Sequence, residues 1–210
     1  MHELSSISNR KSLKPGQHHV FEGDAARGFA NVVNGVGKLA RGAADGRTQI
    51  VGLLFASDFL GSYGEDAAHA QEPYSIEAAT ELELCLFPRQ AFQEIAARHP
   101  GLERRLLART LSDLEIARDW MVLLGRKTAS ERVASFLLHV SDRMRSHGCK
   151  PTESFELPLN RVDIADHIGL TVETVSRQIT RLKKLGAIAM AGPRRVTGID
   201  RDALAEVAGF

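Results

Sequence analysis

The sequence has few cysteines and no long apolar run, and each shortage excludes a class of protein. Its 210 residues include two cysteines, Cys85 and Cys149, too few and too far apart for a disulfide or metal framework. No apolar run approaches the roughly 18 residues of a membrane span, and the first residues carry no secretory signal. The sequence therefore predicts a protein of a reducing cytoplasm with no membrane partner.

Motifs of catalysis and metal binding are missing as well. There is no nucleophile elbow, P-loop or dinucleotide-binding fingerprint. None of the eight histidines forms an i,i+4 pair or follows a Cys-x-x-Cys motif. The sequence thus predicts neither an enzyme nor a metal site, although a haem held by one histidine would leave no motif.

The charge is nearly balanced over the whole chain but not along it. The composition is that of an ordinary globular protein, with 43% apolar and 25% charged residues and a net charge of +1. Between residues 158 and 197, seven basic residues outnumber three acidic ones. This local excess favours an acidic polymer as the partner of the C-terminal part.

The strongest pattern, residues 161–186, predicts two short helices joined at Gly169. Glycine supplies the left-handed turn, and the Thr171 hydroxyl is suited to cap the second helix. The apolar residues of the second helix recur on one face: Val172, Val175, Ile179, Leu182 and Leu185. This arrangement is typical of a helix-turn-helix.

The opposite face of the second helix is suited to reading DNA. Arg177 can pair bidentately with guanine and Glu173 can accept from cytosine, with Ser176 between them. The alternative is an amphipathic core helix with a solvated charged face, but the turn glycine, the cap and these side chains coincide. The predicted phosphate contacts are Arg161, Thr171, Thr180, Arg181, Lys184, Arg194 and Arg195.

The rest of the chain divides into a β-rich and a helical part. The first ten or so residues are expected to be loose, and short apolar runs separated by Gly and Asp over residues 19–87 predict an antiparallel sandwich or barrel. Helices are expected over residues 88–97, 102–125, 129–147 and 202–207. Strands near residues 155–157, 188–190 and 196–199 predict a wing beside the helix-turn-helix, with Arg194 and Arg195 at its tip.

The long helix carries an uncharged stripe at alternating spacings of three and four, which predicts a coiled-coil dimer interface. Its residues are Leu107, Thr110, Leu114, Ala117, Met121 and Leu124, called the seam below. The alternative is that the stripe packs on the β-rich part of the same chain.

Together these features resemble the Crp/Fnr family of bacterial transcription regulators. The most specific match is GLTVETVSRQITRLKKLG, in which residues 173–177 have the family's ETVSR motif. Residues 21–24 and 35–39 resemble its β-roll corners, and residues 123–134 are close to the hinge of the FixK and FnrN branch. The resemblance implies an α+β fold with a β-roll like that of cyclic-nucleotide-binding domains (1–97), a dimerisation helix (98–126) and a winged helix-turn-helix (127–210).

Within the family the chain is most similar to a FixK-type activator. Val172 before Glu173 resembles the Fnr/FixK reading helix, which implies Val172, Glu173, Ser176 and Arg177 as base readers. The implied target is a TTGAT-N4-ATCAA-like palindrome bound by a homodimer. The resemblance also implies contact with RNA polymerase through residues 110–113 and β-roll loops, and genes of low-oxygen respiration or nitrogen fixation.

Two departures from the family argue against its familiar cofactors. Residues 64–79 contain no Arg or Lys to hold a cyclic phosphate. The sequence has no cysteine before Cys85, so it lacks the N-terminal cysteines that would ligate an iron–sulfur cluster. The sequence therefore predicts no bound cofactor. Cys149, near Arg145 and Lys150, is a candidate redox site. An alternative is a regulator gated by haem, nitric oxide or a small organic ligand in the β-roll.

Overall fold

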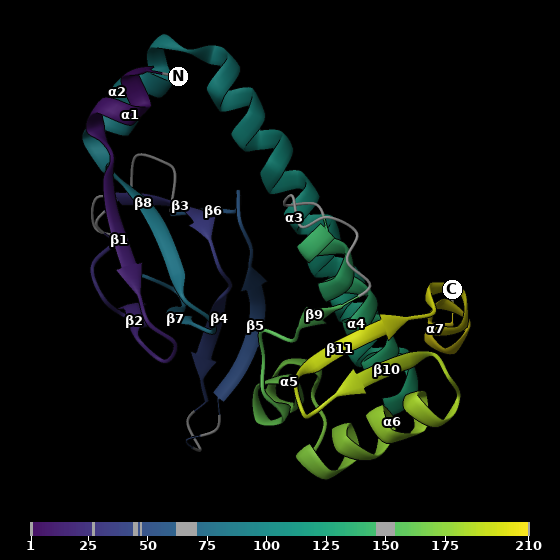
Figure 1. Cartoon of the computed structure of the whole chain (residues 1–210). Coiled ribbons are helices and arrows are strands. Elements are labelled where there is room, and N and C mark those ends of the chain that lie inside the picture. Colours follow the sequence, from purple (N-terminus) through teal and green to yellow (C-terminus); the bar gives the residue numbers. More distant parts are fainter. Residues whose placement is uncertain are drawn as a thin grey trace. The chain divides into compact units, whose positions relative to one another are not determined.

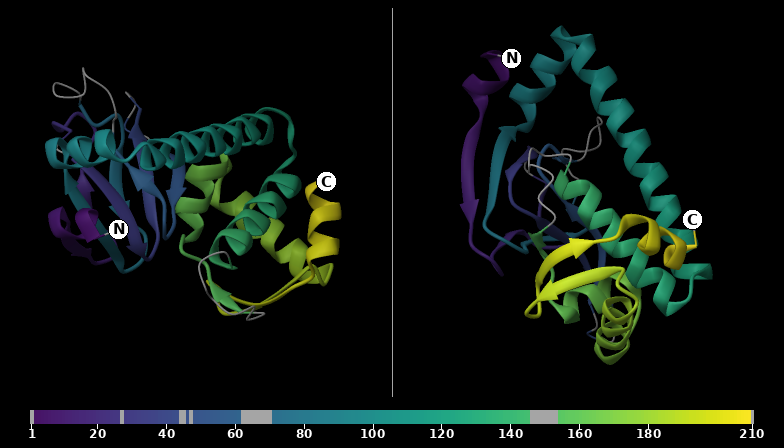
Figure 2. Two further views of the ribbon diagram at one scale, coloured as in Figure 1. Left: turned by 90° about the horizontal axis from the view of Figure 1, so that it is seen from above. Right: turned by 45° about the vertical axis from the view of Figure 1, so that its right-hand side comes forward.

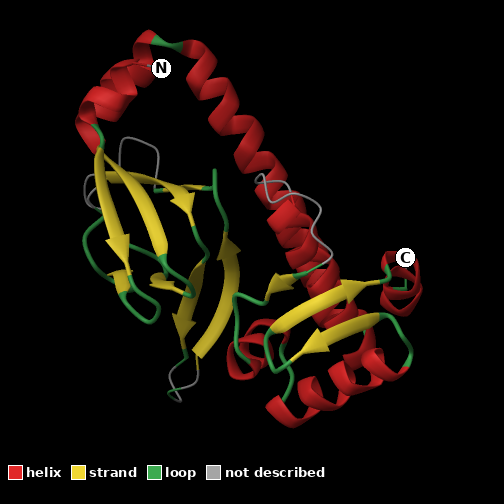
Figure 3. Ribbon diagram, in the orientation of Figure 1, coloured by secondary structure: helices red, strands yellow, loops and turns green. Residues whose placement is uncertain are grey.

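The protein folds into two compact units, Met1–Ala117 and Arg118–Phe210, in a computed structural model (Figure 1). The structure describes residues 2–26, 28–43, 46, 48–61, 71–145 and 154–209. Strands dominate the first unit, and helices with a small sheet form the second (Figure 3). In the described ranges, no helix combines the length and the apolar character needed to cross a membrane.

Two antiparallel four-stranded sheets form the first unit, in the orders β1-β8-β3-β6 and β2-β7-β4-β5. The strands are β1 (Asn9–Leu13), β2 (His18–Val20), β3 (Gly28–Asn34), β4 (Gly37–Gly42), β5 (Thr48–Leu54), β6 (Phe59–Leu60), β7 (Ser75–Ala78) and β8 (Leu82–Pro88). Alternate side chains of both sheets meet in one core, which includes Val32, Leu54, Ile76 and Leu84. The predicted β-roll is confirmed.

The corner between β3 and β4 requires glycine. Gly35 has φ 86°, and a Cβ there would clash with the carbonyl oxygen of Glu81. Gly35 begins the segment of residues 35–39, whose sequence resembles a β-roll corner. The close approach of two backbones explains why a residue without a side chain occupies this position.

Residues 2–10 form regular structure, contrary to the prediction. They form α1 (His2–Ile7) and the first part of β1, which pairs with β8 along its whole length. Leu4 and Ile7 pack against the cluster of Phe29, Phe92 and Ala96. The segment is polar because an edge strand and a short covering helix bury only part of their side chains.

Two helices follow the β-roll, α2 (Arg89–Arg98) and α3 (Pro100–Arg126). The long helix begins two residues earlier than predicted, because proline at the first helical position lacks only an N–H that would be unsatisfied anyway. The boundary between the two units lies within α3.

The second unit is built around α4 (Ala129–Arg145), which packs against α5, α6 and α7. The other elements are β9 (Phe155–Glu156), α5 (Arg161–Ile168), α6 (Val172–Lys184), β10 (Ile188–Ala191), β11 (Arg195–Ile199) and α7 (Arg201–Ala208). The sheet order is β10-β11-β9, and Figure 2 shows the β10–β11 hairpin from two further sides. This is the predicted winged helix-turn-helix.

Candidate nucleic-acid interface

Local capping defines both helices of the helix-turn-helix. The Asn160 side chain accepts hydrogen bonds from the backbone N–H groups of Val162 (2.8 Å) and Asp163 (2.9 Å) at the start of α5. Gly169 ends α5 with φ 63° in the left-handed region. Thr171 then caps α6 by accepting from the N–H of Thr174 at 3.2 Å. The structure confirms the predicted turn and cap.

One face of α6 is buried and the other is open to solvent. Val175, Ile179 and Leu182 are at most 4% exposed and pack into the domain. The prediction of Leu185 as a fifth buried position is wrong. Leu185 is the C-cap and is 56% exposed, because the helix ends there and its side chain no longer follows the buried stripe.

The polar side chains predicted to contact DNA lie together on the open face. Val172 is half-buried at the start of the helix, and the remaining members of the face are exposed: Glu173, Ser176, Arg177, Thr180, Arg181 and Lys184. Five of these residues, from Ser176 to Lys184, line one open hollow on the surface. A helix with a continuous polar face of this kind can enter a major groove and place these side chains against base edges and phosphates.

Electrostatics fix the chemical form of the Glu173 side chain. Hydrogen bonds from its own backbone N–H and from the Thr171 hydroxyl hold the pKa of Glu173 below its ordinary value, and the Arg177 charge adds to this effect. The side chain is therefore a carboxylate at neutral pH, a form that can only accept hydrogen bonds. That is the form needed to accept from the exocyclic amine of cytosine.

The three arginines at and beside the wing differ in their hydrogen bonds and exposure. Arg194 donates through Nε (3.0 Å) and Nη2 (2.9 Å) to the carbonyl of Leu157, and through Nη2 to that of Pro158. Arg161 donates to the carbonyl of Pro193 at 2.9 Å, and burial lowers the pKa of its guanidinium. Only Arg195 of these three is classed as exposed. Arg194 therefore attaches the wing turn to the segment before α5, and Arg161 attaches it to the start of α5, because half-buried guanidinium groups need acceptors.

The seam of α3 is exposed along its whole length. All six predicted residues are exposed, with Leu107 at 61% and Met121 at 73%. Leu111, which the spacing argument missed, flanks the seam and is 54% exposed. The seam residues of the first unit, Leu107, Thr110, Leu114 and Ala117, therefore do not pack on the β-roll of the same unit. A different side of α3 makes that contact through Arg109, whose Nη2 binds the buried Asp58 carboxylate.

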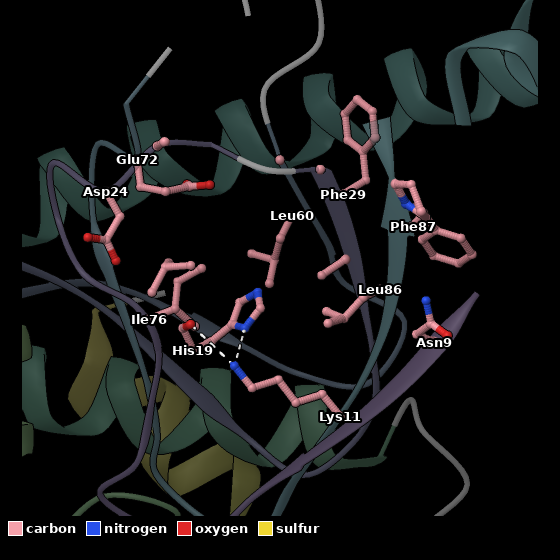
Figure 4. Close-up of a pocket in the computed structure, with 16 residues that line it drawn as sticks. Asn9, Lys11, His19, Asp24, Phe29, Leu60, Glu72, Ile76, Leu86 and Phe87 are labelled. Atoms are coloured by element: carbon pink, nitrogen blue, oxygen red, sulfur yellow. Dashed lines mark hydrogen bonds between the residues drawn. The ribbon is translucent and has the colours of Figure 1, made fainter. Parts of the chain in front are cut away.

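A cavity of about 550 Å³ lies in the first unit, with charged groups at two places on its wall (Figure 4). Lys11 Nζ donates to His19 Nδ1 at 3.1 Å, and burial together with the Lys11 charge lowers the pKa of His19 to about 4. Glu72 and Asp24 lie elsewhere on the wall, and burial raises the pKa of Glu72, an effect that Arg89 opposes and Asp24 reinforces. Apolar side chains complete the lining, including those of Phe29, Leu60, Ile76 and Leu86.

This cavity does not fit a cyclic phosphate at its Glu72 end, where two carboxylates would face the anion. Lys11 is the only lysine or arginine among the described lining residues, and it is engaged with His19. Residues 64–70, part of the stretch without Arg or Lys, lie outside the described residues, and so does the candidate redox residue Cys149. Within the described residues, no three His, Cys, Asp or Glu side chains gather as a metal site would require.

Each of the two units matches a known family of domains. Residues 10–99 match the family model of the cyclic nucleotide-binding domain, and residues 131–207 that of the Crp-like helix-turn-helix domain. The transcriptional activator protein FnrL of Cereibacter sphaeroides is 41% identical over 209 residues, which cover 98% of this chain and 83% of FnrL. The nitrogen fixation regulation protein FixK of Bradyrhizobium diazoefficiens is 38% identical over 191 residues, covering 90% and 78%. The solved structure of FixK2 from Bradyrhizobium japonicum is 30% identical, covers 96% of this chain and 97% of FixK2, and superposes with a TM-score of 0.85.

Proposed function

Because the chain belongs to the Crp/Fnr family of DNA-binding transcription regulators, we propose that it is a homodimeric activator of a TTGAT-N4-ATCAA-like palindrome. The chain is a regulator of the FnrL and FixK type and not an enzyme. Its proposed targets are genes of low-oxygen respiration or nitrogen fixation, the second of which appears in the name of the FixK relative.

The exposed face of α6 is the observation that carries this proposal. Glu173, Ser176 and Arg177 lie near the N-terminal end of the helix, the part that contacts base edges in this class of domain. Val172 precedes them, half-buried, as the fourth member of the proposed base-reading set. The proposed phosphate contacts are Arg161, Thr171, Thr180, Arg181, Lys184, Arg194 and Arg195. Arg161 and Arg194 also hold the wing turn through their hydrogen bonds to backbone carbonyls.

A dimer is proposed because a palindrome presents two equal half-sites about one helical turn apart. The seam offers an apolar stripe of the kind that pairs two helices, and its side chains are exposed in the single chain. The proposed contacts with RNA polymerase, near residues 110–113 and in β-roll loops, would then be presented twice on each promoter.

The proposed activity needs no cyclic nucleotide or iron–sulfur cluster. The acidic end of the cavity supports the first part of this statement, because Glu72 and Asp24 would repel a cyclic phosphate. The proposed regulator would then respond mainly to its own abundance.

Binding of the purified protein to the palindromic duplex tests the proposal directly. The affinity should be compared with that for a scrambled duplex of the same composition at one fixed salt concentration, because phosphate contacts make every affinity salt-dependent. Nanomolar, sequence-specific binding without additives is expected. Binding that requires an added effector would contradict the ungated form of the proposal.

The cavity favours a second candidate, a regulator of the same family gated by an effector in the β-roll. Its volume suits a small organic molecule, and its separated basic and acidic groups suit one that carries both charges. Haem and nitric oxide are the other effectors considered. The visible absorption spectrum of the purified protein tests for haem, and a loss of specific DNA affinity on extensive dialysis would support any dissociable effector.

A further inference from the structure

One arginine of the second unit joins the end of α3 to the turn of the helix-turn-helix. Arg132 lies in the first turn of α4 and is half-buried. Its Nη2 donates to the carbonyl of Leu124 at 2.7 Å, and its Nε donates to that of Lys127 at 2.9 Å. Its Nη1 donates to the carbonyls of Ile168 and Gly169 at 3.2 and 3.3 Å. Four carbonyl oxygens from two separate segments therefore converge on one guanidinium.

These carbonyls lie at the ends of two helices. Leu124 lies in the last turn of α3 and Lys127 directly follows that helix, whereas Ile168 is the last residue of α5 and Gly169 is its C-cap. The final carbonyls of a helix lack intrahelical partners and carry partial negative charge. A guanidinium is permanently charged and has five N–H donors in a rigid fork, so one side chain can satisfy both ends together.

The geometry around Gly169 shows how close the two segments are. A Cβ built on Gly169 would lie 3.5 Å from Arg132 Nη1 and 3.6 Å from Leu124 Cδ2. Leu124 is also the last residue of the seam. The end of the proposed dimer interface and the turn before the reading helix therefore meet at the Arg132 side chain.

The connection between α3 and α4 is itself held firmly. Thr128 and Glu131 cap the start of α4 reciprocally, with the Thr128 N–H donating to Glu131 Oε2 at 2.6 Å and the Glu131 N–H to Thr128 Oγ1 at 3.4 Å. Lys127 Nζ donates to Ser135 Oγ and to the carbonyl of Ala208, both at 2.9 Å. These bonds attach the connection to α4 and α7, and the Arg132 bonds attach it to the helix-turn-helix.

We propose that Arg132 is a positioning residue that sets the angle between α3 and the reading helix α6, and thereby the half-site spacing that a dimer accepts. The inference rests on the proposed function, since it requires a symmetric dimer on a palindrome. Each α6 is placed relative to the seam through the end of α3, so a changed angle moves the two reading helices of a dimer apart or together. The contacts of each α6 with its own half-site do not change.

Loss of the Arg132 hydrogen bonds therefore weakens binding of a dimer to both half-sites at once, and leaves binding to one half-site unchanged. The second half-site is bound at an effective concentration that depends on how well the first binding event positions the second helix. Loss of the Arg132 bonds lowers that concentration. A residue that merely stabilised the fold would weaken full-site and half-site binding together.

The test compares Arg132→Gln, Arg132→Lys and the wild type, with Arg201→Gln as a matched control. Arg201 is also an arginine of the second unit, and it binds Asp142 of α4 at 2.6 Å away from the α3 end. Each full-length protein is titrated at fixed salt with the TTGAT-N4-ATCAA duplex, with a duplex that has one half-site, and with palindromes of three to six spacer base pairs. Sedimentation confirms that each variant is dimeric at the concentrations used.

For Arg132→Gln, affinity for the full palindrome should fall on the order of 10-fold or more, with half-site affinity within about threefold of wild type and a flatter preference for spacer length. Arg132→Lys keeps the charge but not the fork, so an intermediate ratio is expected, and Arg201→Gln should leave the ratio unchanged. An equal fall on full and half-sites, or an unchanged spacer preference, would overturn the positioning role. A wild type that did not prefer the palindrome to the half-site would overturn the proposed function itself.

Discussion

Truncating Met121 to alanine is expected to weaken the proposed homodimer by about 30- to 150-fold. Met121 is 73% exposed in the single chain and lies at a central position of the seam's second half. Complete burial of a methionine side chain contributes roughly 1.5–3 kcal/mol. Loss of the exposed part beyond Cβ therefore removes about 1–1.5 kcal/mol per copy. A symmetric interface contains two copies, which gives about 2–3 kcal/mol per dimer.

The neighbouring residue provides a matched control. Val122 is 58% exposed and apolar, but it lies about 100° farther round the helix, outside the seam. Val122→Ala should change the dimer dissociation constant by less than about threefold, because no apolar surface is covered there on pairing.

Sedimentation equilibrium of both variants over a graded concentration series measures the dimer dissociation constant. Circular dichroism checks that helix content is retained, which is expected because alanine favours the helix. A Val122→Ala variant that dissociated as readily as Met121→Ala would show that the register of the seam is wrong. A monomer fraction that neither variant changed would refute α3 as the dimer interface.

Three further predictions concern DNA binding, the wing and the β-roll. Arg177→Ala should weaken the free energy of binding to the palindrome by roughly 1–3 kcal/mol and relax sequence specificity. Lys184→Ala should weaken binding to all duplexes alike and reduce the slope of log affinity against log salt concentration. An equal loss of affinity on all sequences for both variants would contradict these roles. Arg194→Ala should destabilise the second unit by about 1–3 kcal/mol in chemical denaturation, because it leaves buried carbonyls unpaired, while Arg195→Ala should stay within about 0.5 kcal/mol; equal stabilities would refute the distinction. Since the folded-state pKa of His19 is about 4 against an ordinary 6.5, the unfolded chain binds the extra proton between these values, so stability should fall as pH drops from 6.5 to 4. His19→Gln should lose this part of the pH dependence, and an unchanged slope would count against the assignment.

The helix-turn-helix could be predicted from the sequence because its signals are local. Gly169 and Thr171 act within one turn of the residues they cap, and the buried stripe of α6 follows the period of the helix itself. The exposed reading face was found for the same reason. The exposure of the seam residues agrees with the stripe read from the sequence, because that stripe follows a regular spacing within one helix.

The sequence argument failed where the outcome depends on distant segments. Residues 2–13 are polar and gave no periodic signal, yet they form a strand, because β8 offers backbone partners, and a helix that packs on the Phe29 cluster. Arg194 and Arg195 are adjacent and chemically alike, and only the approach of the segment before α5 gives one of them carbonyl acceptors. Leu185 fits the apolar period but lies where the helix has already ended.

The sequence by itself determined the kind of protein, the polar face of α6 and the apolar stripe of α3, because those features follow from residue chemistry at fixed spacing along one helix. Tertiary structure decided which arginines hold the wing turn, which charged groups share the cavity, and what holds the end of α3 to the helix-turn-helix. The acceptors of Arg132 are backbone carbonyls, which every residue possesses, so they could not be predicted from a pattern of side chains. Their convergence exists only after α3, α4 and α5 have packed.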